Sequence, residues 1–244
     1  MHTVRFCLDK HEVCVGELIG DTIYTNDSEY LYTEVELLPP TSPSKIICVG
    51  LNYADHAAEL NMEIPSRPLL FVKTPNTVLA ARSVAKLLPE NKNLEYEAEL
   101  GVAIKKQCSN VLAEDADDVI LGYTCVNDIS NRADQTVEDN WVRAKSFDNS
   151  APIGPVITSP DAVPESADIE LKINGETRQQ GNTSDFIFSI PEIIEEITKY
   201  ITLEKGDLIA TGTPAGVGPL QDGDQVMISI DGIPPLTHSV SIPN

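Results

Sequence analysis

The clearest β-strand in the sequence is LEYEAELGVAI, residues 94–104. Apolar side chains alternate along it from Leu94 to Ile104, and Glu95, Glu97 and Glu99 occupy positions between them. Successive side chains of a strand point to opposite faces of a sheet, so this period of two is typical of a strand. The segment therefore predicts a strand with one apolar face and one acidic face.

Further strands are expected on both sides of this segment. They are KIICVG (45–50), the centre of PSRPLLFVKTP (65–75), VILGYTCVND (119–128), APIGPVIT (151–158), DIELKING (168–175), the start of GDLIATGTPAGVG (206–218), and QVMISIDGI (225–233), which closes the chain. Asn174-Gly175 is a turn signal. Strands do not alternate regularly with helices, which argues against a doubly wound sheet. The fold class is therefore mainly β with some α.

One helix is well defined by its start. Ser189 and Glu192 have the spacing of a capping box, in which each side chain bonds the other residue's backbone N–H. Ile193, Ile194, Ile197 and Ile201 follow at helical spacing. Residues 52–60 suit a short helix or a loop.

The N-terminal region differs from the rest of the chain. Residues 1–36 alternate short apolar runs with polar turns, and LLPPTSPS (37–44) is typical of an irregular crossover. We expect a small β-rich lobe at residues 1–42 and a main domain at residues 43–244.

The charge balance excludes several classes of partner. The 244 residues include 38 Asp and Glu against 17 Lys and Arg, which gives a net charge of −21. Such a surface repels nucleic acid and anionic membranes. The acid excess suits either an ordinary acidic protein or adaptation to high salt, where charges are screened, and the small number of basic residues favours the second.

The sequence predicts a cytoplasmic protein. No apolar run is long enough for a signal peptide or a membrane-spanning helix. The five cysteines are odd in number and form no CxxC pair, so free thiols are expected.

Two acidic residues of the central strand are candidate metal ligands. Glu97 and Glu99 lie two residues apart on one face, about 7 Å along the backbone. They suit either a solvated acidic edge or a divalent cation, since hard cations take oxygen ligands. Asp128 ends the strand at 119–128, and a loop could bring it close.

His56 and Glu59 are spaced to share one helical face. A carboxylate beside an imidazole orients it and suits it to act as a general base, although such pairs are also common on surfaces. The GTPAGVG loop (212–218) allows close backbone approach to an anion, but it lacks the GK[ST] of a P-loop, and no helix pattern follows it as in a dinucleotide-binding fingerprint.

Together these segments resemble the fumarylacetoacetate hydrolase superfamily. Its motifs occur in family order over about residues 45–233: GLNYADHAAE, RPLLFVKTP, LEYEAELGVAI, GYTCVNDIS, AKSFDNSAPIGP, NGETRQQGNTSDFIFSI and GDLIATGTPAGVG. The resemblance implies a mixed β-sandwich or β-roll with a small N-terminal domain, and a homodimer.

The resemblance also implies a role for individual residues. Glu97, Glu99 and Asp128 match the ligands of Mg²⁺ or Mn²⁺. His56 and Glu59 match a pair on a lid that activates water, and Lys145 matches the lysine that faces developing negative charge. The expected substrate-binding residues are Gln135, Thr213, Arg67 and Lys73. Ala133 departs from the family pattern, which puts a contact between Arg132 and an aspartate in doubt unless Asp134 supplies it.

The implied activity is metal-dependent cleavage of C–C bonds in 2-oxo acids, as in an acylpyruvase or an oxaloacetate decarboxylase. A 2-hydroxyhepta-2,4-diene-1,7-dioate isomerase and a sugar-acid dehydratase are the alternatives within the superfamily. A non-catalytic metal-binding member is disfavoured, because the ligands, His56, Glu59 and Lys145 are all present.

Overall fold

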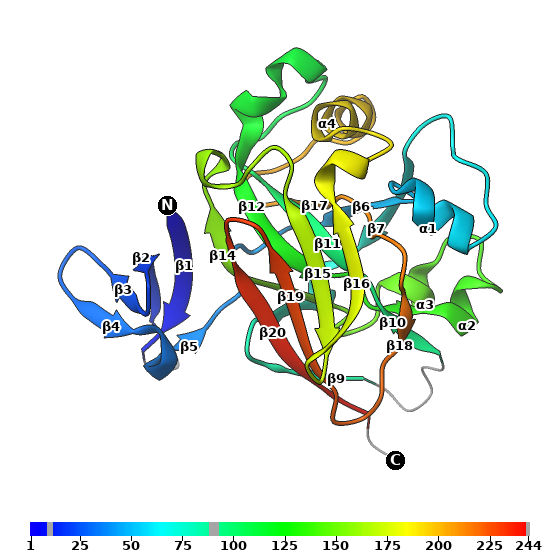
Figure 1. Cartoon of the computed structure of the whole chain (residues 1–244). Coiled ribbons are helices and arrows are strands. Elements are labelled where there is room, and N and C mark those ends of the chain that lie inside the picture. Colours follow the sequence, from blue (N-terminus) through cyan, green and yellow to red (C-terminus); the bar gives the residue numbers. More distant parts are fainter. Residues whose placement is uncertain (9–11, 88–92, 243–244) are drawn as a thin grey trace.

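The computed structural model describes residues 1–8, 12–87 and 93–242. Within these residues the chain forms three β-sheets and four α-helices (Figure 1). The fold is mainly β, as the sequence predicts.

The largest sheet has 12 strands and forms the centre of the molecule. Its main path runs β4 (Glu29–Leu31), β3 (Thr22–Tyr24), β2 (Val13–Ile19), β1 (His2–Cys7), β14 (Ala151–Thr158), β12 (Ile120–Asn127), β11 (Ala98–Ile104), β17 (Leu208–Ala210), β6 (Ile46–Gly50) and β7 (Leu69–Lys73). β5 (Glu36–Leu37) pairs with β1, and β8 (Val78–Ala80) pairs with β14. The sheet is mixed, since β17 and β6 are parallel whereas β11 and β12 are antiparallel.

Two smaller sheets complete the β-structure. The five-stranded sheet runs β16 (Glu176–Asn182), β15 (Asp168–Ile173), β19 (Gln225–Ile230), β20 (Ile233–Ser241) and β9 (Val84–Lys86). The three-stranded sheet runs β13 (Ser130–Asn131), β10 (Leu94–Tyr96) and β18 (Gly218–Pro219). Asn174 and Gly175 form the turn between β15 and β16, both with positive φ, as the sequence predicts.

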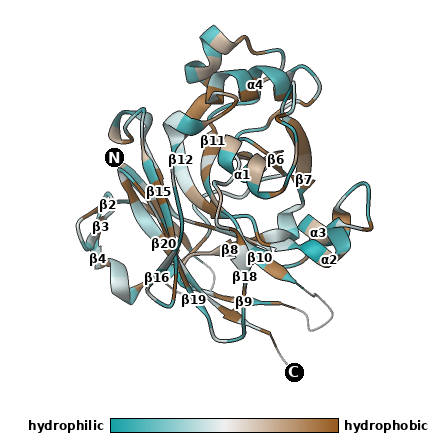
Figure 2. Ribbon diagram, turned by 45° about the vertical axis from the view of Figure 1, so that its right-hand side comes forward, coloured by the Kyte–Doolittle hydropathy of each residue, from teal (hydrophilic) through white to brown (hydrophobic). Residues whose placement is uncertain are grey.

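The main core lies between the large sheet and the five-stranded sheet. Leu100 of β11 and Cys125 of β12 belong to the same buried cluster as Leu171, Ile228 and Leu236 of the facing sheet. Figure 2 shows these two sheets as packed layers. A second cluster forms where α4 (Ile190–Thr198) covers strands of the large sheet. β11 contributes to both clusters and is buried along its whole length.

The remaining helices are short. They are α1 (Ala54–Glu59), α2 (Arg132–Gln135) and α3 (Val142–Lys145), with 3₁₀ turns at Tyr32–Glu34, Pro75–Thr77, Ala113–Val119, Pro160–Ala162 and Thr183–Asp185. α4 begins at the predicted Ser189 capping box, with the Glu192 carboxylate 2.8 Å from the Ser189 backbone nitrogen. It ends before Ile201, so this residue lies beyond the helix.

The N-terminal strands continue the large sheet instead of forming an isolated layer. β1 pairs with β14, with Thr3 opposite Ile157. β1 to β5 extend to one side of the molecule (Figure 1). The domain boundary after residue 42 stays a prediction.

Two expected strands were wrong in extent. Residues 94–104 form two strands, β10 and β11, in different sheets, with Glu97 between them. Residues 225–233 do not close the chain as one strand, because β19 turns at Asp231-Gly232 into β20. β10 and β11 pair with different neighbours, and side-chain periodicity within one segment does not report on these pairings. β19 and β20 instead form a hairpin with each other, and Asp231-Gly232 is a turn signal inside the expected strand.

Candidate metal centre and active site

The break between β10 and β11 places the acidic residues. At this point the backbone N–H groups bond to side-chain amides: that of Glu97 donates to Asn127 Oδ1 at 3.0 Å, and that of Ala98 donates to Gln179 Oε1 at 2.9 Å. β11 then pairs with β12, and the Asp128 N–H donates to the Glu97 carbonyl at 2.9 Å. The end of β12 therefore lies beside the start of β11, which brings Asp128 to the strand glutamates.

Glu97, Glu99 and Asp128 form a compact acidic triad. One ligand oxygen from each lies within 4.8 Å of the others. The residues are only 4%, 1% and 0% exposed. This burial excludes a solvated acidic edge for these residues, and like charges buried together are costly unless cations neutralise them.

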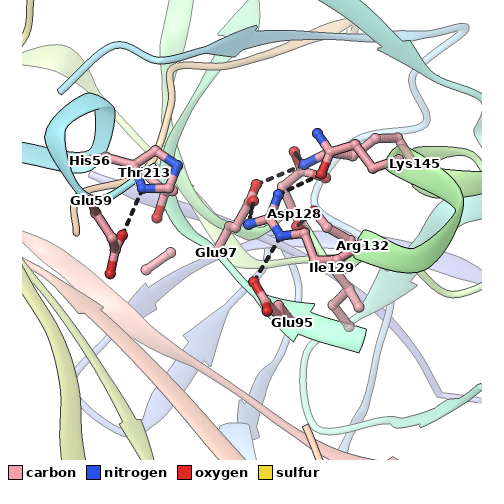
Figure 3. A network of polar contacts seen from close by, with 12 residues as sticks. His56, Glu59, Glu95, Glu97, Asp128, Ile129, Arg132, Lys145 and Thr213 are labelled. Carbon is pink, nitrogen blue, oxygen red and sulfur yellow. Dashed lines mark hydrogen bonds and ion pairs between the residues drawn. The ribbon is translucent and has the colours of Figure 1, made fainter. Parts of the chain in front are cut away.

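Two buried lysines partly neutralise the triad. Lys145 Nζ lies 2.8 Å from both Glu97 Oε2 and Asp128 Oδ2 (Figure 3). Lys73 Nζ lies 2.6 Å from Asp128 Oδ1. Burial disfavours the charge on Lys145, but the adjacent Asp128 and Glu97 carboxylates outweigh this effect and hold its pKa above the ordinary range. The adjacent carboxylates therefore favour the charged form of Lys145.

Arg132 supplies a third cation from the start of α2. Its guanidinium contacts a Glu97 oxygen, lies 2.7 Å from Glu95 Oε2, and donates to Gln135 Oε1 at 2.7 Å. Burial acts to raise the pKa of Glu97, but Lys145 and Arg132 outweigh it and hold that pKa well below its usual range. Glu95, for which the sequence suggested no role, thus pairs with Arg132. Asp134 does not take this place, because it accepts instead from Asn131 Nδ2 at 2.7 Å.

Glu99 is the member of the triad that lacks a cation. Among the described residues no ion pair reaches it, and the Gly212 N–H donates to its Oε2 at 2.8 Å. Burial raises the pKa of Glu99 well above its ordinary value, and Asp128 and Glu97 add to this. A buried carboxylate beside two others, with oxygen donors only, fits a hard divalent cation. The triad can therefore hold a metal ion.

A histidine–carboxylate pair lies across the site on α1. His56 Nδ1 is 3.0 Å from Glu59 Oε2, and the Gly216 N–H donates to Glu59 Oε1 at 3.0 Å. His56 is only 4% exposed, whereas the Glu59 side chain is 32% exposed, so the imidazole of this pair is buried and its carboxylate is partly accessible. Figure 3 shows the pair on one side of Glu97 and Lys145 on the other. A carboxylate accepts hydrogen bonds, so the contact favours a proton on Nδ1, and in the neutral imidazole with that tautomer Nε2 keeps its lone pair.

The segment before α1 is fixed by polar and aromatic contacts. Asn52 Nδ2 donates to the Thr211 carbonyl at 2.8 Å, and Asn52 Oδ1 accepts from the Phe188 N–H at 2.8 Å. The rings of Tyr53 and Phe186 pack edge to face, with centroids 5.1 Å apart. α1 is therefore held against the loop that follows β17.

A cavity of about 330 Å³ joins these groups. Its polar wall includes Glu97, Glu99, Lys145, Thr213 and His56. Its other walls are mainly apolar, and they comprise Val49, Leu51, Leu60, Met62, Leu69, Phe71 and Trp141. Arg132 and Gln135 also line it.

The structure does not bring every expected substrate-binding residue to the cavity. Gln135 and Thr213 line it, whereas Lys73 is fully buried against Asp128 and is not a lining residue. Arg67 is exposed and borders an adjoining groove with Glu63 and Tyr200, which shares Leu51, Met62 and Leu69 with the cavity. Lys73 shares a sequence motif with the site, but its side chain contacts the back of the triad.

Sequence reasoning missed the residues that support the triad from other strands. Asn127 Nδ2 lies 2.9 Å from Nε2 of the buried His238 on β20, and Gln179 is a residue of β16. Gln179 lies in the quoted motif NGETRQQGNTSDFIFSI, but nothing in the spacing shows that it reaches Ala98, 81 residues away.

A family comparison agrees with this geometry. Residues 45–241 match the model of the fumarylacetoacetate (FAA) hydrolase C-terminal domain. The chain belongs to the fumarylacetoacetate hydrolase family. It is an enzyme of that family, with the FAH fold.

Individual relatives cover most of the chain. Oxaloacetate tautomerase YisK of Bacillus subtilis is 44% identical over 225 residues, which are 86% of this chain and 75% of the relative. The crystal structure of 5-carboxymethyl-2-hydroxymuconate delta-isomerase from Mycobacterium smegmatis superposes with a TM-score of 0.92 at 34% identity, over 100% of both chains. Maleylpyruvate hydrolase from Sphingobium, solved with manganese(II) and pyruvate, gives a TM-score of 0.84 at 29% identity over 100% of both chains.

No helix among the described residues is long and apolar enough to cross a membrane.

Proposed function

We propose that this FAH-family enzyme binds Mg²⁺ or Mn²⁺ and cleaves a C–C bond in a small 2-oxo acid, as an acylpyruvate hydrolase or an oxaloacetate decarboxylase. The observation that carries this proposal is the cavity with Lys145 and the triad glutamates Glu97 and Glu99 on one side and the oriented His56 on the other. Glu97, Glu99 and Asp128 would hold the ion. When bound, the ion supplies Lewis-acid polarisation of a 2-oxo group.

Lys145 places positive charge where the substrate becomes an enolate. An ammonium group has three N–H donors. Two of them face Glu97 and Asp128, and the group also lies 4.7 Å from the ring centroid of the cavity-lining Phe71. We expect the third donor to bond a substrate oxygen. A fixed cation in a buried cavity stabilises developing negative charge without reorganising at the moment of reaction.

His56 serves as the general base in the hydrolytic reaction. Its Nε2 takes a proton from water, and the resulting hydroxide bonds to the distal carbonyl carbon of the acylpyruvate. The C–C bond then breaks, the acyl part leaves as a carboxylic acid, and the electron pair remains on the pyruvate carbon as an enolate. The proton held on His56 Nε2 passes to that carbon and completes pyruvate. Glu59 keeps the proton on Nδ1 and so leaves Nε2 as the base at the start of the reaction.

The size of the cavity favours short substrates. A volume of about 330 Å³ lies at the lower end of the roughly 300–1,000 Å³ typical of ligand sites. The apolar wall formed by Leu69, Phe71 and Trp141 suits a small acyl group at the far end of the substrate.

Tautomerisation or isomerisation is the second candidate, and the named relatives favour it. One of these relatives is an oxaloacetate tautomerase and another is a delta-isomerase. The same enolate forms when a base removes a proton next to the 2-oxo group, and no water is consumed. His56 would then move a proton between carbon and oxygen.

Parallel assays separate these reactions. Acetylpyruvate, oxaloacetate and a dienol dioate are each supplied with Mg²⁺ or Mn²⁺, at low and at high salt because of the net charge of −21. Product analysis distinguishes acetate and pyruvate, carbon dioxide and pyruvate, or an isomer of unchanged mass. Turnover of acetylpyruvate or oxaloacetate with bond cleavage supports the proposal. Isomerisation alone favours the second candidate, and inactivity on all three substrates overturns both.

A further inference from the structure

Gln179 is a buried residue outside the cavity that hydrogen-bonds both the strand carrying Glu97 and Glu99 and the loop carrying Thr213. It is 1% exposed on β16 and contacts both Ala98, between the triad glutamates, and the loop after β17. We propose that Gln179 is a positioning residue that fixes the Thr213 hydroxyl as a hydrogen-bond donor toward the substrate carboxylate. This inference rests on the proposed function in taking the ligand to be a carboxylate.

The orientation of the Gln179 amide is set by two backbone groups. Its Oε1 lies 2.9 Å from the Ala98 nitrogen, which can only donate. Its Nε2 lies 2.8 Å from the Pro214 carbonyl oxygen, which can only accept. A flipped amide would lose both hydrogen bonds, so the amide has one arrangement.

This arrangement determines what Thr213 can offer. The second Nε2 hydrogen of Gln179 points to Thr213 Oγ1 at 2.8 Å, so the hydroxyl oxygen accepts. The hydroxyl proton is then directed elsewhere, and Thr213 lines the cavity although only 3% of it is exposed. The cavity therefore presents a donor at this position, which favours a carboxylate over a ligand group that donates.

β16 also supports the rest of the loop. A Cβ atom on Gly181 would lie 2.7 Å from Pro214 Cβ, and one on Gly216 would lie 2.4 Å from the Arg178 carbonyl oxygen. The loop is therefore in direct contact with the strand at both glycines. Because the Gly216 N–H also holds Glu59, the loop cannot shift to compensate for a lost Gln179 contact without disturbing α1.

A double-mutant cycle tests this role. The variants are Gln179→Met, which keeps the side-chain length without the amide, Thr213→Val, and the two combined. Gln180→Met is the matched control, because Gln180 is the exposed neighbour on the same strand, and among the described residues its side chain hydrogen-bonds Glu170 alone, at 3.5 Å. The first readout is the Kd of oxalate, a dicarboxylate, titrated by calorimetry into the Mn²⁺-loaded protein. The second is KM and kcat for the substrate that is turned over.

We expect Gln179→Met and Thr213→Val each to raise the oxalate Kd by on the order of 10-fold or more, and KM by a similar factor with a smaller change in kcat. The double variant should be within about twofold of Thr213→Val, since the second change acts through a hydroxyl that is already gone. Gln180→Met should match the wild type. A wild-type Kd for Gln179→Met, or an equal effect of that change with and without the Thr213 hydroxyl, overturns the proposal.

Two further measurements keep the test decisive. If Gln179→Met does not fold, Gln179→Glu retains the acceptor for Ala98 and presents an acceptor to the Thr213 proton. It should therefore raise the oxalate Kd by at least as much, and a Kd equal to wild type overturns the proposal. If no substrate of the preceding subsection is turned over, the proposed function fails, while the oxalate titrations still decide the role of Gln179.

Discussion

Replacing Glu99 by glutamine should stabilise the metal-free protein and abolish its response to metal. The change removes a buried charge that no cation neutralises among the described residues, and Gly212 can still donate to the new amide oxygen. Glu97→Gln is the matched variant, because Glu97 is equally buried but contacts both Lys145 and Arg132. The two isosteric changes should therefore act in opposite directions on the free energy of unfolding.

The magnitudes follow from the burial and the ion pairs. The desolvation cost of a buried ion is several kcal/mol, and proton uptake and the Gly212 bond reduce it, so we expect Glu99→Gln to add about 1–3 kcal/mol. Glu97→Gln leaves Lys145 with Asp128 alone and Arg132 with Glu95 alone, and should cost at most about 3–5 kcal/mol. For a chain of this size, each kcal/mol shifts Tm by about 2–4 °C. At 100 times its Kd a metal ion should stabilise the wild type by about 2.7 kcal/mol.

Calorimetric melting of EDTA-treated protein, with and without Mn²⁺, measures both effects. The expected pattern is a higher Tm for metal-free Glu99→Gln, a lower Tm for Glu97→Gln, and a Mn²⁺-dependent increase of about 5–10 °C in the wild type alone. The reasoning is refuted if Glu99→Gln melts as low as Glu97→Gln without metal. It is also refuted if Glu99→Gln keeps the wild-type increase with Mn²⁺.

Three other changes test the site and its supports. His56→Ala should reduce acetylpyruvate hydrolysis by about 10²–10⁴-fold and leave the Mn²⁺ Kd unchanged; a wild-type hydrolysis rate contradicts the base assignment. Lys73→Met removes one of the cations beside Asp128 and should lower the free energy of unfolding, measured in urea, by about 3–5 kcal/mol, with KM within about threefold of wild type. Arg67→Gln changes an exposed residue and should alter stability by less than about 0.5 kcal/mol. A large rise in KM for Lys73→Met with normal stability would favour a direct contact between Lys73 and the substrate. Burial lowers the pKa of His238 from 6.5 to about 4. Between these pH values His238 is protonated in the unfolded chain but not in the folded protein. The free energy of unfolding should therefore fall by about 3 kcal/mol as the pH drops from above 6.5 to about 4. His238→Gln keeps an acceptor for Asn127 and should remove that part of the slope, which urea unfolding at several pH values measures; an unchanged slope argues against a neutral buried His238.

Most of the expected strands could be predicted from the sequence, because apolar periodicity and turn residues are local properties, although the turn at Asp231-Gly232 was missed. The sequence was not sufficient for the break at Glu97. The partners of the backbone there are the side chains of Asn127 and Gln179, which come from β12 and β16. Side-chain amides that replace a strand partner leave no pattern in the segment that they hold.

Local spacing also predicts some site residues and not others, because it does not report on contacts between distant segments. His56 and Glu59 are three residues apart on one helix, so spacing alone indicates their contact. Lys73 and Arg67 belong to one motif, yet Lys73 is buried behind Asp128 and Arg67 is exposed. A motif indicates that residues lie near a site, whereas the sheet pairing and the loop path determine which side chain enters the cavity.

The charges in the site explain how so acidic a protein can accept an acidic substrate. Among the described residues around the cavity, the buried or half-buried carboxylates are Glu95, Glu97, Glu99 and Asp128, and the cations paired with them are Lys73, Lys145 and Arg132. The three cations balance three of the carboxylates, and the fourth, Glu99, has a pKa raised by burial and by Asp128 and Glu97, so it takes up a proton readily in the metal-free site. That site is then close to neutral, whereas a divalent cation that displaced the proton would give a net charge of +1, in a region where the low dielectric strengthens every interaction. The carboxylate of a 2-oxo acid would therefore be attracted by the loaded site and not by the metal-free one. We expect metal binding to control substrate binding through Glu99, because the other three carboxylates already have protein cations beside them.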